Sequence, residues 1–218
     1  APMKRLILVR HARAVDPKTG RPDFDRPLVP EGEKQAASMA KKMKNEGVKP
    51  DLMISSPADR ALETAHIFAR RFNYPIQNIL LSQDIYEHDD AASLLRVVRD
   101  TDDRHEALMM FGHDPGLSLL ARHLVRGPRF DIPKAGAVRI ELSVSSWKEA
   151  GPGNARLVAC DIPGGAVKEK KWRKKIRRQL TDRMVRTSME ILEGLDRAAA
   201  AEVARTLRDS LKKVASRF

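Results

Sequence analysis

The sequence is poor in the residues that stabilise secreted domains and build many metal sites. It contains one cysteine, Cys160, so it can form neither an internal disulfide nor a cysteine-rich zinc site. Its longest aliphatic run, Leu6-Ile7-Leu8-Val9, is far too short for a membrane span or for the apolar part of a signal peptide. We therefore expect a cytoplasmic protein without a transmembrane segment.

Aromatic residues are also scarce, at 5% of the 218 residues, although 42% of the residues are hydrophobic. Leu, Val, Ile, Ala and Met must therefore fill the core. The hydrophobic share argues against global disorder. The length suits one α/β domain with an appendage, or two small domains.

The net charge of +12 is distributed unevenly along the chain. From Lys168 to the end there are 16 Lys and Arg against 7 Asp and Glu, whereas residues 1–167 have 25 against 22. Eight basic residues and one acidic residue lie between Lys168 and Arg178. Such a cluster attracts polyanions, although a solvated helix face that aids solubility has the same composition.

Short apolar runs alternate with amphipathic stretches as far as about residue 124, which predicts an α/β sheet. After this region, two further strands are predicted to form a pair joined by a Gly- and Pro-rich loop. The predicted strands are 4–9, 52–55, 78–81, 107–112, 137–143 and 155–161, and the predicted helices are 31–45, 58–72, 91–99 and 117–125.

The composition changes after Pro163-Gly164-Gly165, which we take as a boundary between a domain over 3–163 and an extension over 166–218. Apolar residues in the extension recur every three to five positions, which predicts an α-helical hairpin. Three functions are open for this extension: a homodimer through its helices, a polyanion or membrane-surface contact through residues 168–178, or a solubilising appendage.

Four cationic or titratable side chains follow predicted strands: Arg10, His11, Arg60 and His113. Ligands of open α/β sheets bind at the carboxyl ends of the strands, so these side chains can converge on one point. A phosphoryl group suits such a cluster, because guanidinium groups match its oxygens and imidazoles can donate to the remaining ones.

An imidazole in this setting can also act as a nucleophile. A neutral histidine can attack phosphorus in line and form a phosphohistidine that water later hydrolyses. Nearby arginines favour the neutral form and stabilise the charge that develops on the phosphoryl oxygens. Because this chemistry needs no metal, we predict a metal-independent enzyme without a cofactor.

Four motifs occur together, in a fixed order, over about residues 3–162. Together they resemble the histidine phosphatase superfamily, which is phosphoglycerate mutase-like, and especially its SixA-type protein phosphohistidine phosphatases. The motifs are Leu8-Val9-Arg10-His11-Ala12, Arg26-Pro27-Leu28 followed by Glu31-Gly32, Ser55-Ser56-Pro57-x-x-Arg60-Ala61-x-x-Thr64, and Gly112-His113 with Pro115.

The resemblance implies a three-layer α/β/α fold with a mixed central sheet. It makes His11 the nucleophile and Arg10, Arg60 and His113 its phosphate ligands. Most members have glycine after the Arg-His pair, and Ala12 can replace it only where φ is negative. Arg26 can line the rim of the pocket, but we interpret it as a surface or packing residue.

In many members of the superfamily, an Asp or Glu after the third strand is the general acid. In this sequence Glu87, Asp89 and Asp90 are the candidates for that position. Glu87 is our first choice. A phosphohistidine substrate makes less demand on such an acid, because imidazole is a better leaving group than an alkoxide.

Only about fifty residues separate Arg60 from His113, so no long insertion can cap the site. An open site favours a phosphorylated protein, such as a histidine phosphotransfer domain, as the substrate. Two alternatives remain: a general phosphomonoesterase that acts on a nucleotide or another small phosphoester, and a non-catalytic protein that binds phosphate or polyanions.

Overall fold

A computed structural model describes residues 3–126 and 131–164, together with residues 174, 178, 205 and 206. The predicted extension over 166–218 therefore lies outside the described residues except for these four. The helical hairpin and the division into 3–163 and 166–218 stay predictions. Within the described part of the chain, no helix has the length and apolar character needed to cross a membrane.

The centre of the fold is one mixed six-stranded sheet with the strand order β3-β2-β4-β1-β5-β6. β3, β2, β4 and β1 are parallel. At one edge of the sheet, β5 pairs antiparallel with β1, and β6 pairs antiparallel with β5. The predicted mixed sheet is confirmed. The strands are β1 (Lys4–Arg10), β2 (Leu52–Ser55), β3 (Leu80–Leu81), β4 (Ala107–Gly112), β5 (Ala137–Leu142) and β6 (Ala155–Asp161).

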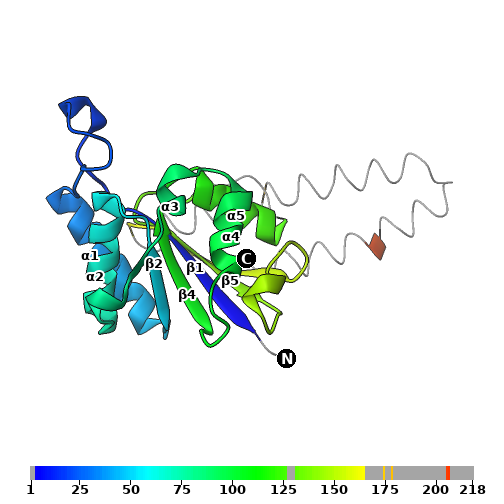
Figure 1. Cartoon of the computed structure of the whole chain (residues 1–218). Helices are drawn as coiled ribbons and strands as arrows, with labels where there is room; N and C mark the ends of the chain where they lie inside the picture. The colour runs from blue at the N-terminus through cyan, green and yellow to red at the C-terminus, as the bar shows by residue number, and fades with distance from the viewer. Residues whose placement is uncertain (1–2, 127–130, 165–173, 175–177, 179–204, 207–218) are drawn as a thin grey trace, which may run out of the picture. The chain divides into compact units, whose positions relative to one another are not determined.

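Helices cover both faces of the sheet, which gives the predicted α/β/α layers (Figure 1). α1 (Pro30–Asn45) and α2 (Asp59–Phe72) pack on one face, and α4 (Ala91–Arg99) and α5 (Gly116–Val125) pack on the other. Short helical turns complete the chain: η1 (Pro17–Thr19), η2 (Ile76–Asn78), α3 (Asp84–Glu87) and η3 (Trp147–Glu149).

The central strand β1 is buried on both faces. Ile7 and Val9 belong to the core beneath α1 and α2. Because successive strand residues point to opposite faces, Leu6 and Leu8, which are also buried, face the other helical layer. A continuous aliphatic run is what a strand buried on both faces requires.

The parallel strands end at the same edge of the sheet. Arg10 on β1 is in register with Gly112 on β4, and the His11 N–H donates to the Gly112 carbonyl at 3.0 Å. Next to them, the Ser56 N–H donates to the Phe111 carbonyl at 2.9 Å. The three segments that carry the predicted site residues therefore meet at this edge.

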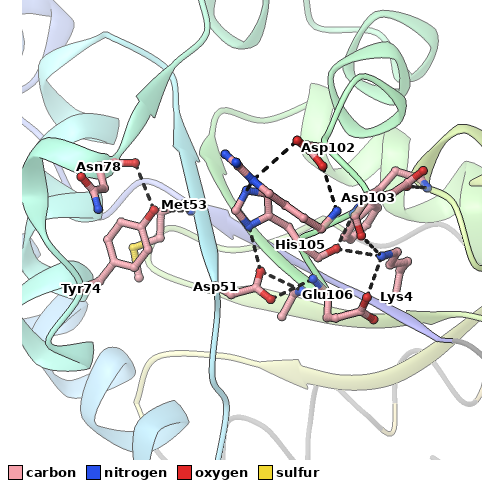
Figure 2. A network of polar contacts seen from close by, with 12 residues as sticks. Lys4, Asp51, Met53, Tyr74, Asn78, Asp102, Asp103, His105 and Glu106 are labelled. Atoms are coloured by element: carbon pink, nitrogen blue, oxygen red, sulfur yellow. Dashed lines mark hydrogen bonds and ion pairs between the residues drawn. The ribbon is translucent and has the colours of Figure 1, made fainter.

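A second polar cluster closes the opposite end of β1 (Figure 2). The Lys4 ammonium group donates to the Asp103 and His105 carbonyls at 2.6 and 3.0 Å and to the Glu106 carboxylate at 2.8 Å. Asp51 accepts from the Glu106 backbone N–H at 2.8 Å. Lys4 is only 2% exposed, so these partners compensate for the loss of water around a buried charge.

Two element predictions need correction. The strand expected over 78–81 is shorter, because residues 76–78 form the 3₁₀ turn η2 and only Leu80 and Leu81 pair with β2. The short helix α3 was not predicted, because four residues are too few to show a helical period.

Candidate active site

His11 lies at the carboxyl edge directly after β1, and it is only 7% exposed. Its Nδ1 is 2.7 Å from the Ala12 carbonyl oxygen. Because a carbonyl oxygen can only accept, Nδ1 carries the ring proton and Nε2 keeps its lone pair. Burial, together with the charges of His113, Arg60 and Arg10, lowers the pKa of His11 to about 3. The ring is therefore neutral at pH 7.

His113, which follows β4, faces His11 with the ring centroids 5.2 Å apart. Its Nε2 is 2.8 Å from the Ser56 hydroxyl, which also accepts from the Ala58 N–H at 3.3 Å. The hydroxyl can donate its own hydrogen to Nε2, which leaves the ring proton on Nδ1. Burial, with the charge of Arg60, lowers the pKa of His113 to about 4.

Arg10 and Arg60 are the two cations of the cluster. Arg10 donates from Nη1 to the Ile132 carbonyl at 2.8 Å. Arg60, which is 5% exposed, donates to the backbone carbonyl and to the carboxylate of Asp23. The Nε atoms of both arginines are buried and have no hydrogen-bond partner within the described chain.

Unsatisfied buried donors gather at this site. The Nε atoms of Arg10 and Arg60 and the Nδ1 atom of His113 are three of the five buried side-chain polar atoms without a hydrogen bond in the described chain. The other two, on Arg139 and Asp161, form an ion pair with each other at 2.9 Å. Because buried donors are rarely left unpaired, the three at the site indicate an anionic ligand.

Thr64 ties the end of β1 to the helix that carries Arg60. Its hydroxyl accepts from the Ala12 N–H at 3.1 Å and donates to the Arg60 carbonyl at 2.6 Å. Ala12 is not among the described residues with a positive φ, so its methyl group needs no strained backbone. Alanine can therefore replace the glycine that most superfamily members have at this position.

The segment that contains Arg26-Pro27-Leu28 has a structural role at the rim. The Val15 N–H donates to the Pro27 carbonyl at 2.9 Å, and the Leu28 N–H donates to the Glu63 carboxylate at 2.6 Å. Gly32 is required here, because a Cβ atom would lie 2.0 Å from the Arg13 carbonyl oxygen.

Three further residues reach the site that sequence reasoning missed: Asp23, Phe24 and Tyr86. The Tyr86 ring packs edge-on against His113 and Phe24, with centroids 5.8 and 5.0 Å apart. Its hydroxyl is 3.4 Å from Asp23 Oδ2. Asp23 stands three residues before the Arg26-Pro27-Leu28 motif, and no periodicity marks it as part of a site.

The acid candidates lie on and after α3. Glu87 is exposed, and within the described chain it makes no hydrogen bond or ion pair with the histidines or arginines of the cluster. Asp90 caps α4 by accepting from the Ser93 N–H at 2.8 Å, and this bond lowers the pKa of its carboxyl group. Asp89 is exposed. The role of Glu87 as general acid stays a prediction.

Within the described residues, no group of three or more His, Cys, Asp or Glu side chains could hold a metal ion. Histidine–carboxylate pairs do occur away from the site. His88 lies 3.5 Å from Asp84, and His105 lies 3.6 Å from Asp51, which gives two potential ligands in each case.

The protein is thus an α/β protein whose mixed sheet carries a cluster of histidines and arginines at the carboxyl edge of its parallel strands. The family model described as histidine phosphatase superfamily (branch 1) matches residues 6–82, which include His11 and Arg60. Over these residues, about a third of its length, the chain is similar to this superfamily.

Comparisons with individual proteins agree on the fold. An uncharacterised chloroplastic protein of Arabidopsis thaliana is 27% identical over 176 residues, which cover 75% of this chain and 80% of that protein. A protein described as a phosphohistidine phosphatase SixA from Agrobacterium tumefaciens is 23% identical, with a TM-score of 0.61 over 73% of this chain and 99% of its own. A protein histidine phosphatase SixA in complex with tungstate is 19% identical, with a TM-score of 0.57 over 73% and 97% of the two chains.

Proposed function

We propose that this protein is a metal-independent phosphatase that removes phosphoryl groups from protein phosphohistidine. The observation that carries this function is the set of unpaired buried donors on Arg10, Arg60 and His113 beside the neutral ring of His11. A phosphoryl group supplies the oxygens that these donors lack, and His11 Nε2 supplies a lone pair to attack its phosphorus.

The reaction then takes two displacements at phosphorus. In the first, His11 Nε2 forms a bond to phosphorus while the bond from phosphorus to the substrate imidazole breaks, and its electron pair stays on the substrate nitrogen. In the second, the water oxygen forms a bond to phosphorus and gives up a proton to solvent, while the bond from phosphorus to His11 Nε2 breaks and its electron pair stays on Nε2. Arg10, Arg60 and His113 stabilise the charge on the phosphoryl oxygens in both steps.

The ionisation state of Asp23 favours a substrate whose leaving group needs no acid from the enzyme. Although partial burial of Asp23 opposes the change, hydrogen bonds from Arg26 and Arg60 hold the pKa of its carboxyl group below the usual range. Asp23 is therefore ionised at pH 7 and is a poor proton donor. A protonated imidazole leaves without an acid from the enzyme, whereas an alkoxide does not.

The course of the chain between Arg60 and His113 supports a macromolecular substrate. These residues form α2, η2, β3, α3, α4 and β4, all within the three layers or at their edge, so no inserted domain covers the site. The SixA protein that binds tungstate, a phosphate-like oxyanion, has the same fold. A histidine phosphotransfer domain presents its phosphoryl group on an exposed side chain and suits such a site.

The test is phosphate release from a phosphohistidine protein, a phosphoserine peptide and an aryl phosphate, each in the presence of a chelator. We expect selective turnover of the phosphohistidine protein by the wild type, and its loss in His11→Asn. His123→Asn is the matched control, because His123 is exposed on α5 and makes no side-chain hydrogen bond or ion pair within the described chain. It should retain wild-type turnover.

The covalent step has a separate readout. Quenching the reaction in alkali, where phosphoramidates are stable, should trap a phosphoryl group on His11 that is identifiable by mass spectrometry. Wild-type turnover in His11→Asn would exclude this mechanism. Equal turnover of all three substrates would shift the function to a general phosphomonoesterase, and tight phosphate binding without turnover would make the protein a phosphate sensor.

A further inference from the structure

Asp23 binds the Arg60 guanidinium group at its Nη1 and Nη2 atoms. The Asp23 backbone carbonyl accepts from Arg60 Nη1 at 2.5 Å, and the Asp23 Oδ2 atom accepts from Arg60 Nη2 at 2.9 Å. One residue thus engages both nitrogens at the end of the guanidinium group, with its main chain and its side chain together.

A guanidinium group can bind an oxyanion through two pairs of parallel N–H groups: the end pair on Nη1 and Nη2, and the side pair on Nε and Nη2. Asp23 occupies the end pair of Arg60. The Nε atom of Arg60 is buried without a hydrogen-bond partner in the described chain, so the side pair remains for a ligand.

Asp23 is itself held in place by a second arginine. Arg26 donates from Nε and Nη2 to Asp23 Oδ1 at 3.0 and 2.5 Å, and from Nη1 to the Val15 carbonyl at 2.9 Å. The backbone carbonyl of Phe24, the residue after Asp23, accepts from the Asp59 N–H at 3.1 Å at the start of α2. The segment is therefore anchored on the helix that carries Arg60.

From this geometry we infer that Asp23 is a positioning residue, which fixes the end of the Arg60 guanidinium so that its Nε side receives two phosphoryl oxygens. Arg26 serves as the brace for Asp23 rather than as a phosphate ligand. Asp23 touches neither the phosphorus nor His11 in this scheme and acts through Arg60. Its role depends on phosphate binding in the proposed function, but not on the identity of the substrate.

The sign of the effect separates this role from simple electrostatics. Removing a carboxylate near an anion site should tighten anion binding if charge alone matters. If Asp23 positions Arg60, its removal should instead weaken binding, because Arg60 then loses the orientation of a bidentate ligand.

The experiment measures the equilibrium affinity for inorganic phosphate by calorimetry, in Asp23→Ala, Asp23→Asn and the matched control Asp25→Ala. Asp25 lies two residues away, is exposed and makes no side-chain hydrogen bond within the described chain. We expect Asp23→Ala to weaken phosphate binding roughly tenfold. Asp23→Asn should fall between it and the wild type, because an amide oxygen can still accept from Arg60. Asp25→Ala should bind phosphate as the wild type does, or slightly better.

A double variant shows whether Asp23 acts through Arg60. In an Arg60→Ala background, Asp23→Ala should have no further weakening effect on phosphate affinity. Equal or tighter phosphate binding by Asp23→Ala, an undiminished effect in the Arg60→Ala background, or no phosphate binding by the wild type would each overturn the inference. Because the readout is phosphate affinity, these outcomes are independent of whether phosphohistidine is hydrolysed.

Discussion

His11 and His113 face each other across 5.2 Å, and each ring is fixed through a different nitrogen. His11 is held through Nδ1 by the Ala12 carbonyl, and His113 is held through Nε2 by the Ser56 hydroxyl. One ring therefore offers a lone pair on Nε2, whereas the other offers an N–H on Nδ1. A nucleophile and a hydrogen-bond donor arise from the same residue type because their backbone and hydroxyl partners differ.

His11 is buried and His113 is half-buried, both in the neutral form, which makes stability depend on pH. The unfolded chain binds protons at histidine below about pH 6.5, whereas His11 and His113 in the folded protein take them up only near pH 3 and 4. The unfolded state thus binds more protons, and the free energy of unfolding should fall by about 1.4 kcal/mol per pH unit for each ring as pH drops from 6 to 5.

Urea denaturation at several pH values between 7.5 and 5 measures this dependence. His11→Asn should show a shallower slope than the wild type, and His123→Asn should not. An unfolding free energy that stays constant over this range in the wild type would contradict the neutral state of both rings.

Lys4 should matter for stability and not for chemistry. In Lys4→Met, two backbone carbonyls and the Glu106 carboxylate lose a buried donor, so the free energy of unfolding should drop by about 2–4 kcal/mol. The network lies at the end of β1 opposite to His11, so turnover below the unfolding temperature should stay within about twofold. Lys49→Met, at an exposed lysine, is the control and should leave both quantities unchanged. A large loss of turnover in folded Lys4→Met would contradict this prediction, because it would show that the Lys4 network affects the site at the other end of β1.

Gly32 should not tolerate a methyl group. Its Cβ atom would lie 2.0 Å from the Arg13 carbonyl oxygen, two residues after His11, so α1 or this segment must shift. We expect Gly32→Ala to cost about 1–3 kcal/mol of stability and to lower turnover. Gly20→Ala provides the comparison, because its surroundings are open and only its φ of 77° opposes alanine. Thermal unfolding measures the loss of stability in both variants. A larger loss of stability in Gly20→Ala than in Gly32→Ala would refute the prediction.

The basic extension should be dispensable for turnover of a small substrate. Deleting residues 166–218 should leave turnover of an aryl phosphate within about threefold of the full chain, since the predicted ligands all precede this region. The deletion should change the oligomeric state or reduce binding to heparin, and the latter should weaken with salt. Light scattering and a salt titration of heparin binding measure these effects. A full-length monomer that binds no heparin would leave only the solubilising role.

Strand ends and motif residues could be predicted from the sequence, because both depend on local patterns. Apolar runs predicted the strands β1, β2 and β4, and parallel strands bring their following residues to one edge. The partners of these residues could not be predicted in the same way. Asp23 lies 37 positions before Arg60, and the loop that carries it has no period to indicate which side chain points inward.

Ser56 shows the same limit within a recognised motif. Serine before a helix commonly caps it, but α2 begins after Ala58 without a side-chain cap, and the Ser56 hydroxyl contacts His113 instead. Whether a serine caps a helix or fixes a histidine depends on a residue 57 positions away, and only the folded sheet brings the two together.

The position of β1 in the sheet has a consequence for how the protein comes to be made. Within the part of the chain that the structure describes, β1 pairs with β4 and β5 alone, and both follow it by about a hundred residues or more. During synthesis, the strand that leads into His11 has no partner strand until residue 112 has left the ribosome. The sheet strand that emerges earliest is therefore among the last to be enclosed, and the nascent chain must keep Leu6-Ile7-Leu8-Val9 from aggregating through most of the domain's translation.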